Sequence, residues 1–181
     1  MGLITVSPNV TPRNQQFSTT CWLASLEMLF DWKWRKEDKN RDDKNKNKDG
    51  KTEEEQWKIL EKMDASKDLY PYYMKNNGIS PRECKETAKM LGLRWSGDGE
   101  ITADILAAML PVHGPLWVAG MWRQNHSHVI VVTGVDKDGG KIRYVDPWKN
   151  YSLTESPGTI PWLNDRGDVW KNCDASVMYW V

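Results

Sequence analysis

Apolar residues in the segment CWLASLEMLFDW, residues 21–32, recur with the period of an α-helix. They fall at i, i+1, i+4, i+7 and i+8, which is one face of a helix, and the set comprises Trp22, Leu23, Leu26, Leu29 and Phe30. The preceding Ser18, Thr19 and Thr20 are residue types that cap helix N-termini. The pattern predicts a well-buried helix with Cys21 in its first turn.

The hydrophobic pattern stops after Trp34, and charged residues and asparagine dominate residues 33–55. Such a segment cannot bury enough apolar surface to offset the entropy lost on ordering. We therefore expect an exposed, flexible insertion at about 33–55 within a single domain that spans residues 1–181. A solvated loop is the plain interpretation of this segment, and a partner-docking arm is the functional alternative.

Further helices are predicted downstream from capping patterns. The best defined begins at Ser80, where Pro81 and Glu83 occupy the first and third helical positions, and ends near Gly92. The remaining helices are expected over residues 52–63, 69–76 and 102–110. Pro111 is expected to stop the last of them.

From Gly114 the pattern changes to short runs rich in β-branched and aromatic residues, which are typical of strands. These runs cover residues 115–122, 127–136, 141–148 and 177–181. The sequence KDGG between the second and third runs is a hairpin signal, so these strands should be antiparallel. Helices followed by antiparallel strands indicate an α+β fold.

Composition narrows the functional classes. The 181 residues carry 25 basic and 25 acidic side chains, so no net charge draws the chain to nucleic acid. No apolar run is long enough for a membrane span, and the N-terminus lacks the features of a Sec signal peptide. The three cysteines form no C-x-x-C pair, although Cys84 and Cys173 could form a disulfide. No metal-ligand cluster or cofactor motif is present, so we expect neither.

The position of Cys21 suggests nucleophilic chemistry. A thiol attacks as the thiolate, and both a helix N-terminus and a neighbouring imidazole stabilise that anion. The histidine must come from elsewhere in the chain, and the candidates are His113, His126 and His128. His113 and His126 are expected in loops, whereas His128 opens a long apolar strand from which a ring can face a cleft.

Asp146, near the end of the partner strand, is the candidate that would orient His128. A three-residue hairpin loop at 137–139 places Asp146 opposite Ile130, on the sheet face that carries His128. A two-residue loop at 138–139 places the two side chains on opposite faces. The hypothesis therefore requires an odd-length loop or a bulge, and the alternative for this aspartate is a simple turn role before a proline.

An oxyanion formed during acyl transfer needs hydrogen-bond donors. Gln15 and Gln16 lie just before Cys21, and a side-chain amide there could supply one donor beside the Cys21 backbone N–H. The plain alternative is an exposed loop glutamine.

Together these segments resemble papain-like cysteine proteases, particularly bacterial effector proteases and bacteriocin-leader-processing peptidases. The similarity lies in Q-x5-C-W-x-A-S, residues 15–25, and in residues 114–148, where a Gly-Pro strand is followed by His, a hairpin and Asp-Pro-Trp. The resemblance implies a helical lobe, an antiparallel sheet lobe and a cleft between them. It assigns Cys21, His128 and Asp146 to a catalytic triad and Gln15, or else Gln16, to the oxyanion hole.

The expected function is therefore peptide-bond hydrolysis on a protein or peptide substrate. The same triad can catalyse glutamine deamidation, transglutaminase-like acyl transfer or peptidoglycan amide hydrolysis, and a degenerate papain-like binding module is the non-enzymatic alternative. By analogy with effector proteases, we expect a soluble bacterial toxin delivered by a specialised secretion system. A cognate inhibitor or immunity protein would be its second partner.

Overall fold

The computed structural model describes residues 2–15, 17–37, 78–97, 99–123, 126–148, 155–167 and 173–181. Within these ranges the helices are α1 (Cys21–Glu37), α4 (Pro81–Met90), α5 (Ala103–His113) and α6 (Ile160–Gly167). The strands are β1 (Leu3–Thr5), β2 (Arg94–Ser96), β3 (Leu116–Arg123), β4 (His126–Asp136), β5 (Lys141–Val145), β6 (Ser156–Thr159) and β7 (Val177–Tyr179). The predicted α+β class is confirmed.

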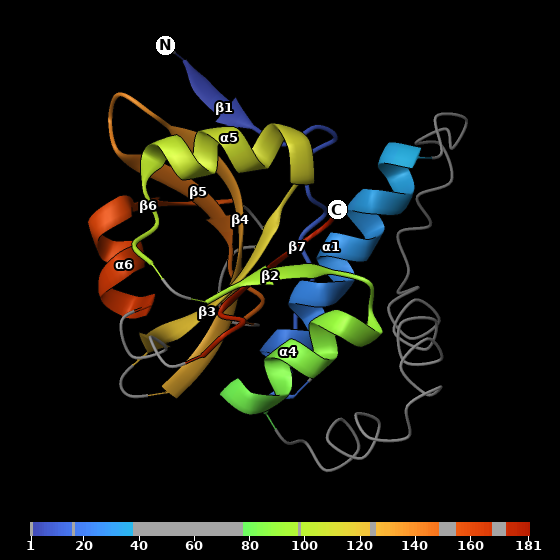
Figure 1. The fold of residues 1–181 in the computed structure, drawn as a ribbon. Coiled ribbons are helices and arrows are strands. Elements are labelled where there is room, and N and C mark those ends of the chain that lie inside the picture. The colour runs from blue at the N-terminus through green and yellow to red at the C-terminus, as the bar shows by residue number, and fades with distance from the viewer. Residues whose placement is uncertain are drawn as a thin grey trace.

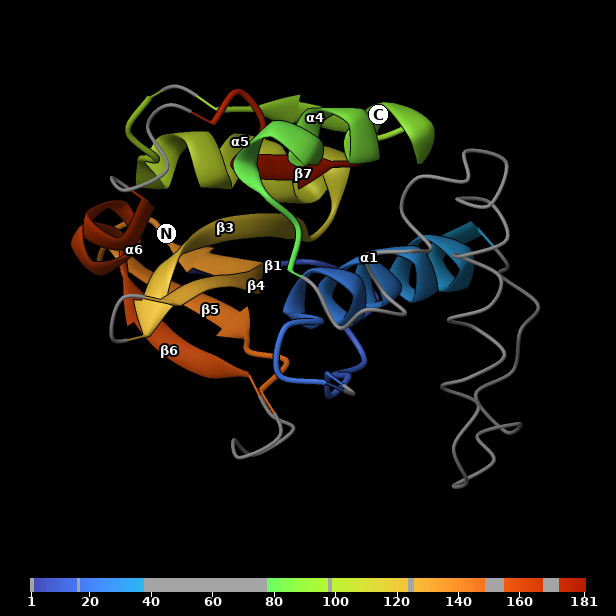
Figure 2. The ribbon, with the colours of Figure 1, turned by 90° about the horizontal axis from the view of Figure 1, so that it is seen from below.

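The strands form one antiparallel sheet in the order β2-β7-β3-β4-β5-β6, with β1 paired to β4 outside this path. Helices α1 and α4 lie together on one side of the molecule, whereas β5, β6 and α6 lie on the other (Figure 1). Seen from below, α1 points away from the end of the sheet (Figure 2), and α4 packs against β2. The chain therefore places a helical part beside a sheet part.

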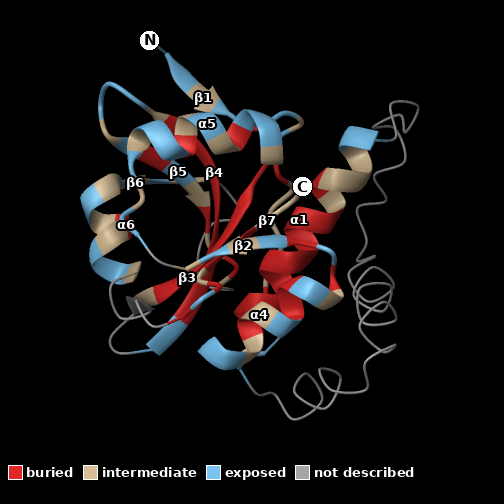
Figure 3. Ribbon diagram, viewed as in Figure 1, coloured by how far each residue is buried: buried red, intermediate tan, exposed pale blue. Residues whose placement is uncertain are grey.

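Helix α1 is the most deeply buried helix that the structure describes. Every residue from Cys21 to Phe30 is buried, so the prediction of a single apolar face was too narrow (Figure 3). The helix packs against β4 and β3. Two tryptophan N–H groups donate to its backbone: Trp117 Nε1 to the Trp22 carbonyl and Trp180 Nε1 to the Leu29 carbonyl, each at 3.1 Å. Trp117 and Trp180 thus pack against α1 with their indole N–H groups satisfied.

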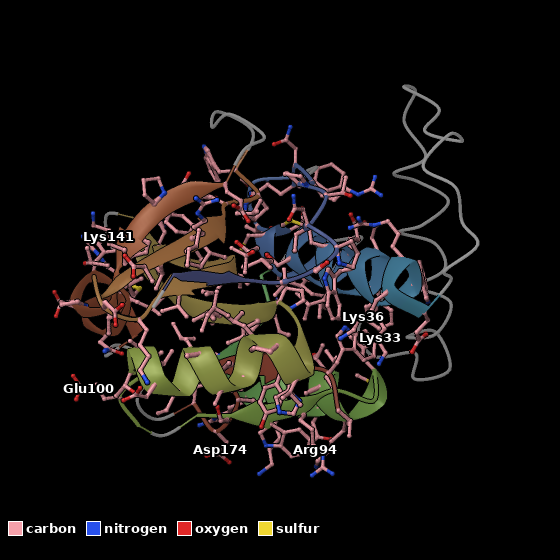
Figure 4. The ribbon with its side chains drawn as sticks, turned by 90° about the horizontal axis from the view of Figure 1, so that it is seen from above. Lys33, Lys36, Arg94, Glu100, Lys141 and Asp174 are labelled. Atoms are coloured by element: carbon pink, nitrogen blue, oxygen red, sulfur yellow. The ribbon has the colours of Figure 1, made fainter. Side chains whose placement is uncertain are left out.

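The predicted insertion at 33–55 begins too early, because α1 continues to Glu37. Arg35 Nε donates to Asp31 Oδ2 at 2.8 Å, and Lys33 pairs with Glu37 at 3.3 Å, both at the i,i+4 spacing that supports helices. Lys33 also lies over the Trp180 ring, and Lys36 over the Trp32 ring. Figure 4 shows the two lysines next to each other beside α1. Basic side chains in the last turn thus extend the helix. The rest of the proposed insertion lies outside the described residues.

Helix α4 confirms the prediction from Ser80. Ser80 is the N-cap, its backbone N–H donates to Glu83 Oε2 at 2.7 Å, and Gly92 follows the last turn with φ +70°. The predicted helices at 52–63 and 69–76 lie outside the described residues. No helix of the described ranges is long and apolar enough to cross a membrane.

The prediction that Pro111 stops helix α5 was wrong. The helix continues to His113, and the N–H of Gly114 donates to the Leu110 carbonyl at 3.0 Å. A proline removes one N–H donor, but close to a C-terminus the following residues still supply theirs. Gly114, with φ +80°, then ends the helix as its C-cap.

All four predicted strand regions contain strands, and the KDGG hairpin joins β4 to β5. Strands β1, β2 and β6 and helix α6 were not predicted. Each of these strands has only three or four residues, too few for a periodic pattern to be recognised.

Gly114 and Gly92 provide a matched pair for testing how tightly α1 is packed. A Cβ at Gly114 would lie 2.3 Å from two atoms of the buried Trp32 ring, whereas a Cβ at Gly92 meets no described atom within 4 Å. Both glycines have positive φ. We expect Gly92→Ala to lower the free energy of unfolding by about 1–2 kcal/mol, the cost of that conformation. Gly114→Ala should cost roughly 2–6 kcal/mol more, because Trp32 must move and because the backbone of Gly114, at φ +80° and ψ −155°, lies in a region open essentially only to glycine.

Urea denaturation monitored by tryptophan fluorescence measures both losses. Equal losses for the two variants would contradict the packing of Trp32 against Gly114.

Candidate active site

Cys21 is the first residue of α1 and is 7% exposed. A tight turn precedes it, in which the carbonyl of Phe17 accepts hydrogen bonds from the Thr20 N–H at 3.2 Å and the Thr20 hydroxyl at 3.1 Å. The helix begins when the Thr20 carbonyl accepts the N–H of Ala24 at 3.1 Å. The Thr20 side chain therefore fixes the turn that precedes Cys21. The backbone N–H groups in the first turn of α1 have no intrahelical acceptor, and they lie beside the Cys21 thiol.

His128 is the third residue of β4 and is 3% exposed. Its neighbour across the β3–β4 ladder is Gly120, which contributes no side chain beside the ring. The β3–β4 register shifts between Gly120 and Arg123, so the ladder becomes irregular next to His128. Bulges of this kind redirect side chains near active sites.

The turn between β4 and β5 differs from the odd-length loop that the sequence hypothesis considered. Asp136 pairs with Lys141, which leaves a four-residue turn at 137–140. If this register continued unchanged along the hairpin, Asp146 would point to the face opposite that of His128.

A bulge at Thr133 restores the required register. The pairing shifts between Val132 and Gly134, and beyond the shift Val131 pairs with Val145. Extending that register by one residue places Asp146 opposite Ile130, on the face that carries His128. The structure thus contains the bulge that was one of the two conditions derived from the sequence.

Strand β1 packs directly against the bulge. The Thr133 carbonyl accepts the N–H of Val6 at 3.0 Å, and Thr5 pairs with Gly134. A Cβ at Gly134 would lie 2.9 Å from Thr5 Cγ2 and 3.0 Å from the Ile4 carbonyl oxygen. Glycine at this position therefore allows β1 to approach the distorted part of β4.

His128 and Asp146 form a short hydrogen bond, with 2.7 Å between Nε2 and Oδ1. The same carboxylate oxygen accepts the backbone N–H of Trp148 at 2.9 Å, which holds Asp146 in place. The Trp148 ring meets the imidazole edge to face, with 6.1 Å between the ring centroids. Because Nε2 is bonded to Asp146, Nδ1 is the nitrogen left to interact with Cys21, whose proximity contributes to the raised pKa of His128.

The surroundings of His128 favour its charged form. Burial by itself lowers the pKa of the imidazole, but the hydrogen bonds to Asp146 and Cys21 outweigh burial. The pKa of His128 is raised from 6.5 to about 9. The ring is therefore an imidazolium at neutral pH.

Gln15 connects the segments that carry Cys21 and Asp146, and it is 2% exposed. Its backbone N–H donates to the Pro147 carbonyl at 2.6 Å, and its side-chain Nε2 donates to the Phe17 carbonyl at 2.8 Å. An amide nitrogen carries two N–H donors, and the bond to Phe17 uses one of them. Gln16, the fallback candidate, lies outside the described residues.

Cys21 and His128 open into a cavity of about 360 Å³ between the helical and sheet parts. Its other lining residues include Ser18, Thr19, Gly78, Ile79, His126 and Trp148. Gln15 is absent from the lining that the structure describes. Among the described residues no group of three or more His, Cys, Asp or Glu is arranged to hold a metal ion.

The other two histidines differ from the loop positions expected of them. His113 ends α5, and its Nδ1 donates to the Trp180 carbonyl at 2.8 Å, a structural contact away from Cys21. His126 is the first residue of β4 and lines the cavity.

A family model described as "Papain-like cysteine protease AvrRpt2" matches residues 5–159, a stretch that contains Cys21, His128 and Asp146. The chain belongs to this family of papain-like cysteine proteases. It is accordingly a cysteine peptidase, and its helical part beside an antiparallel sheet agrees with the papain-like fold. No curated protein sequence matches the protease significantly.

Two features of the protease site were missed at the sequence level. Trp148 was noted within the Asp-Pro-Trp motif, but its contact with His128 was not anticipated. The position of the bulge was also missed, although a glycine inside an apolar strand, here Gly134 after Thr133, is a recognised bulge signal.

The electrostatics of His128 can be measured by NMR titration of its imidazole. In the wild-type protease the pKa of His128 should be about 9. In Asp146→Ala this pKa should fall, because burial still lowers it and the hydrogen bond to Asp146 no longer raises it. Asp146→Asn, which keeps a hydrogen-bond acceptor without the charge, should give an intermediate value. An unchanged pKa in Asp146→Ala would show that the carboxylate does not stabilise the imidazolium in solution.

Proposed function

We propose that this protease hydrolyses peptide bonds with Cys21 as nucleophile, His128 as acid and base, and Asp146 as the residue that orients the histidine. The observation that carries the proposal is the convergence of three separate elements on one imidazole. The N-terminus of α1, strand β4 and the segment after β5 supply Cys21, His128 and Asp146. His128 is hydrogen-bonded to the Asp146 carboxylate and lines the same cavity as Cys21, whose proximity contributes to the raised pKa of the imidazole. This is the geometry that a thiolate–imidazolium pair requires.

In the first step the Cys21 thiolate attacks the carbonyl carbon of the scissile amide. A carbon–sulfur bond forms, and the carbonyl π electrons move to oxygen. The backbone N–H of Cys21 and the second N–H of Gln15 stabilise this oxyanion. His128 then transfers its Nδ1 proton to the leaving nitrogen as the carbon–nitrogen bond breaks, which releases an amine and leaves an acyl-enzyme.

In the second step His128, now neutral, accepts a proton from water at Nδ1. The hydroxide attacks the thioester, and the carbon–sulfur bond breaks to release the carboxylic acid and return the Cys21 thiolate. Asp146 accepts the Nε2 proton in a hydrogen bond throughout, so that Nδ1 stays directed at the thiol. The Trp148 ring covers the imidazole beside this bond and supports its orientation.

Membership of a cysteine protease family favours peptide hydrolysis over deamidation, transglutaminase-like transfer or peptidoglycan amide cleavage. Release of ammonia without backbone cleavage would indicate deamidation instead.

We further propose that the protein is a bacterial effector, following the family description, and that it acts on a protein of the target cell. An inhibitor protein that fills the cavity beside Cys21 would protect the producing cell.

Thiol reactivity tests the nucleophile directly. A papain-family epoxide inhibitor, added at near-stoichiometric dose and neutral pH, should label Cys21 rapidly and leave the buried Cys84 and Cys173 unmodified. The variant His128→Ala should lose the rapid reaction, since it removes the partner of the thiolate. Intact-mass spectrometry with peptide mapping gives the site and the rate. Slow labelling spread equally over the three cysteines would refute an activated Cys21.

The oxyanion role of Gln15 can be separated from its role in the turn. Gln15→Ala should lower kcat on a cleaved peptide by roughly 10²–10³-fold with little change in KM, the effect of losing one oxyanion donor. Thr20→Val is the matched control, because it removes another hydrogen bond to the Phe17 carbonyl without removing a proposed oxyanion donor. If both variants lowered kcat equally, the integrity of the turn would explain the loss.

A further inference from the structure

The other two cysteines lie at the first turn of helix α4. Cys84, on α4, is 0% exposed, and Cys173, which precedes β7, is 2% exposed. Their thiols donate to adjacent carbonyls on the first turn of α4: Cys84 Sγ to Ser80 at 3.4 Å and Cys173 Sγ to Pro81 at 3.3 Å. Both sulfur atoms therefore lie at the same turn of α4.

The two thiols also interact directly. Their interaction raises the pKa of Cys84, which burial raises further, and lowers the pKa of Cys173. Cys173 is therefore the thiol that loses its proton more readily, and Cys84 is the one that keeps it. This asymmetry suits thiol–disulfide exchange, in which one thiolate attacks first and the second thiol completes the bond.

The backbone around the pair is held by several independent contacts. Lys85 Nζ and Asp174 Oδ2 form an ion pair at 3.1 Å, one residue beyond each cysteine. Asp174 lies at the same margin of the molecule as Arg94 of β2 (Figure 4). A Cβ at Gly97 would lie 2.1 Å from the Cys173 carbonyl oxygen, so only glycine lets these segments approach so closely. The two sulfur atoms thus sit on backbones that are already fixed relative to each other.

We propose that Cys84 and Cys173 form an intramolecular disulfide when the chain encounters a disulfide oxidant such as oxidised glutathione. The Cys173 thiolate attacks one glutathione sulfur and displaces a glutathione thiolate, which leaves a mixed disulfide on Cys173. Cys84, after losing its proton, attacks the Cys173 sulfur and displaces the second glutathione. Two protein thiols and one glutathione disulfide thus become one protein disulfide and two glutathione thiols.

The bond would fasten the helix that leads into the active-site wall. Gly78 and Ile79, immediately before the N-cap of α4, line the cavity beside Cys21. A disulfide from α4 to the segment before β7 closes a long loop, which disfavours the unfolded chain and fixes α4 on the sheet. Outside a reducing cytosol the protease would carry this structural bond while Cys21 remained a separate thiol.

The test uses the Cys21→Ala variant of the 181-residue chain, so that only the proposed pair can react. The protein is incubated with oxidised glutathione, both folded and during refolding from urea, so that burial cannot prevent oxidation. We expect an intact mass lower by two hydrogen atoms, a peptide that links Cys84 to Cys173, and a thermal unfolding midpoint raised by several degrees and reversed by reductant. The further variants Cys84→Ser and Cys173→Ser should instead retain one glutathione each after refolding.

Two results would overturn the proposal. Free thiols or two glutathione adducts after refolding would show that the sulfur atoms cannot be joined in this fold. A linked protein with an unchanged or lower unfolding midpoint would show that the bond strains the native structure.

Discussion

From Cys21 to Phe30 helix α1 is buried on every side, and this burial holds the active-site region together. The helix packs on β4 and β3, and tryptophan N–H groups from β3 and from the C-terminal segment donate to its carbonyls. A buried helix cannot rotate or slide without opening cavities in its surroundings. Its N-terminus, and with it the thiol of Cys21, is therefore held at a fixed place beside the sheet.

The sheet supplies the partner groups through deviations from regular pairing. A regular ladder after the four-residue turn would direct Asp146 away from His128, and the bulge at Thr133 corrects this by one residue. The bulge is stabilised by β1, which binds the Thr133 carbonyl and packs on Gly134. The hydrogen bond of 2.7 Å between His128 and Asp146 thus depends on the N-terminal strand β1, which contributes no residue to the proposed triad.

Local signals predicted the elements that carry their own caps or periodic patterns. The helix beginning at Ser80 and the hairpin at KDGG followed from capping and turn chemistry within a few residues. The same approach failed at Pro111 and at Lys33–Glu37, where a local rule indicated an end and the helix continued. At residues 33–37 an ion pair and contacts with Trp180 and Trp32 stabilise the helix, although the charged composition of this segment is typical of a loop.

The sequence by itself determined the candidates for the chemistry: a cysteine at a helix start, a histidine on an apolar strand, an aspartate after the partner strand, and their order along the chain. It left open whether the last two share a face, because strand register depends on turn length and bulges together. Only the tertiary structure decided that question, and it also brought Cys84 beside Cys173 and placed Trp148 against His128. Such contacts join segments distant in sequence, so packing of the whole chain selects them and no local pattern encodes them.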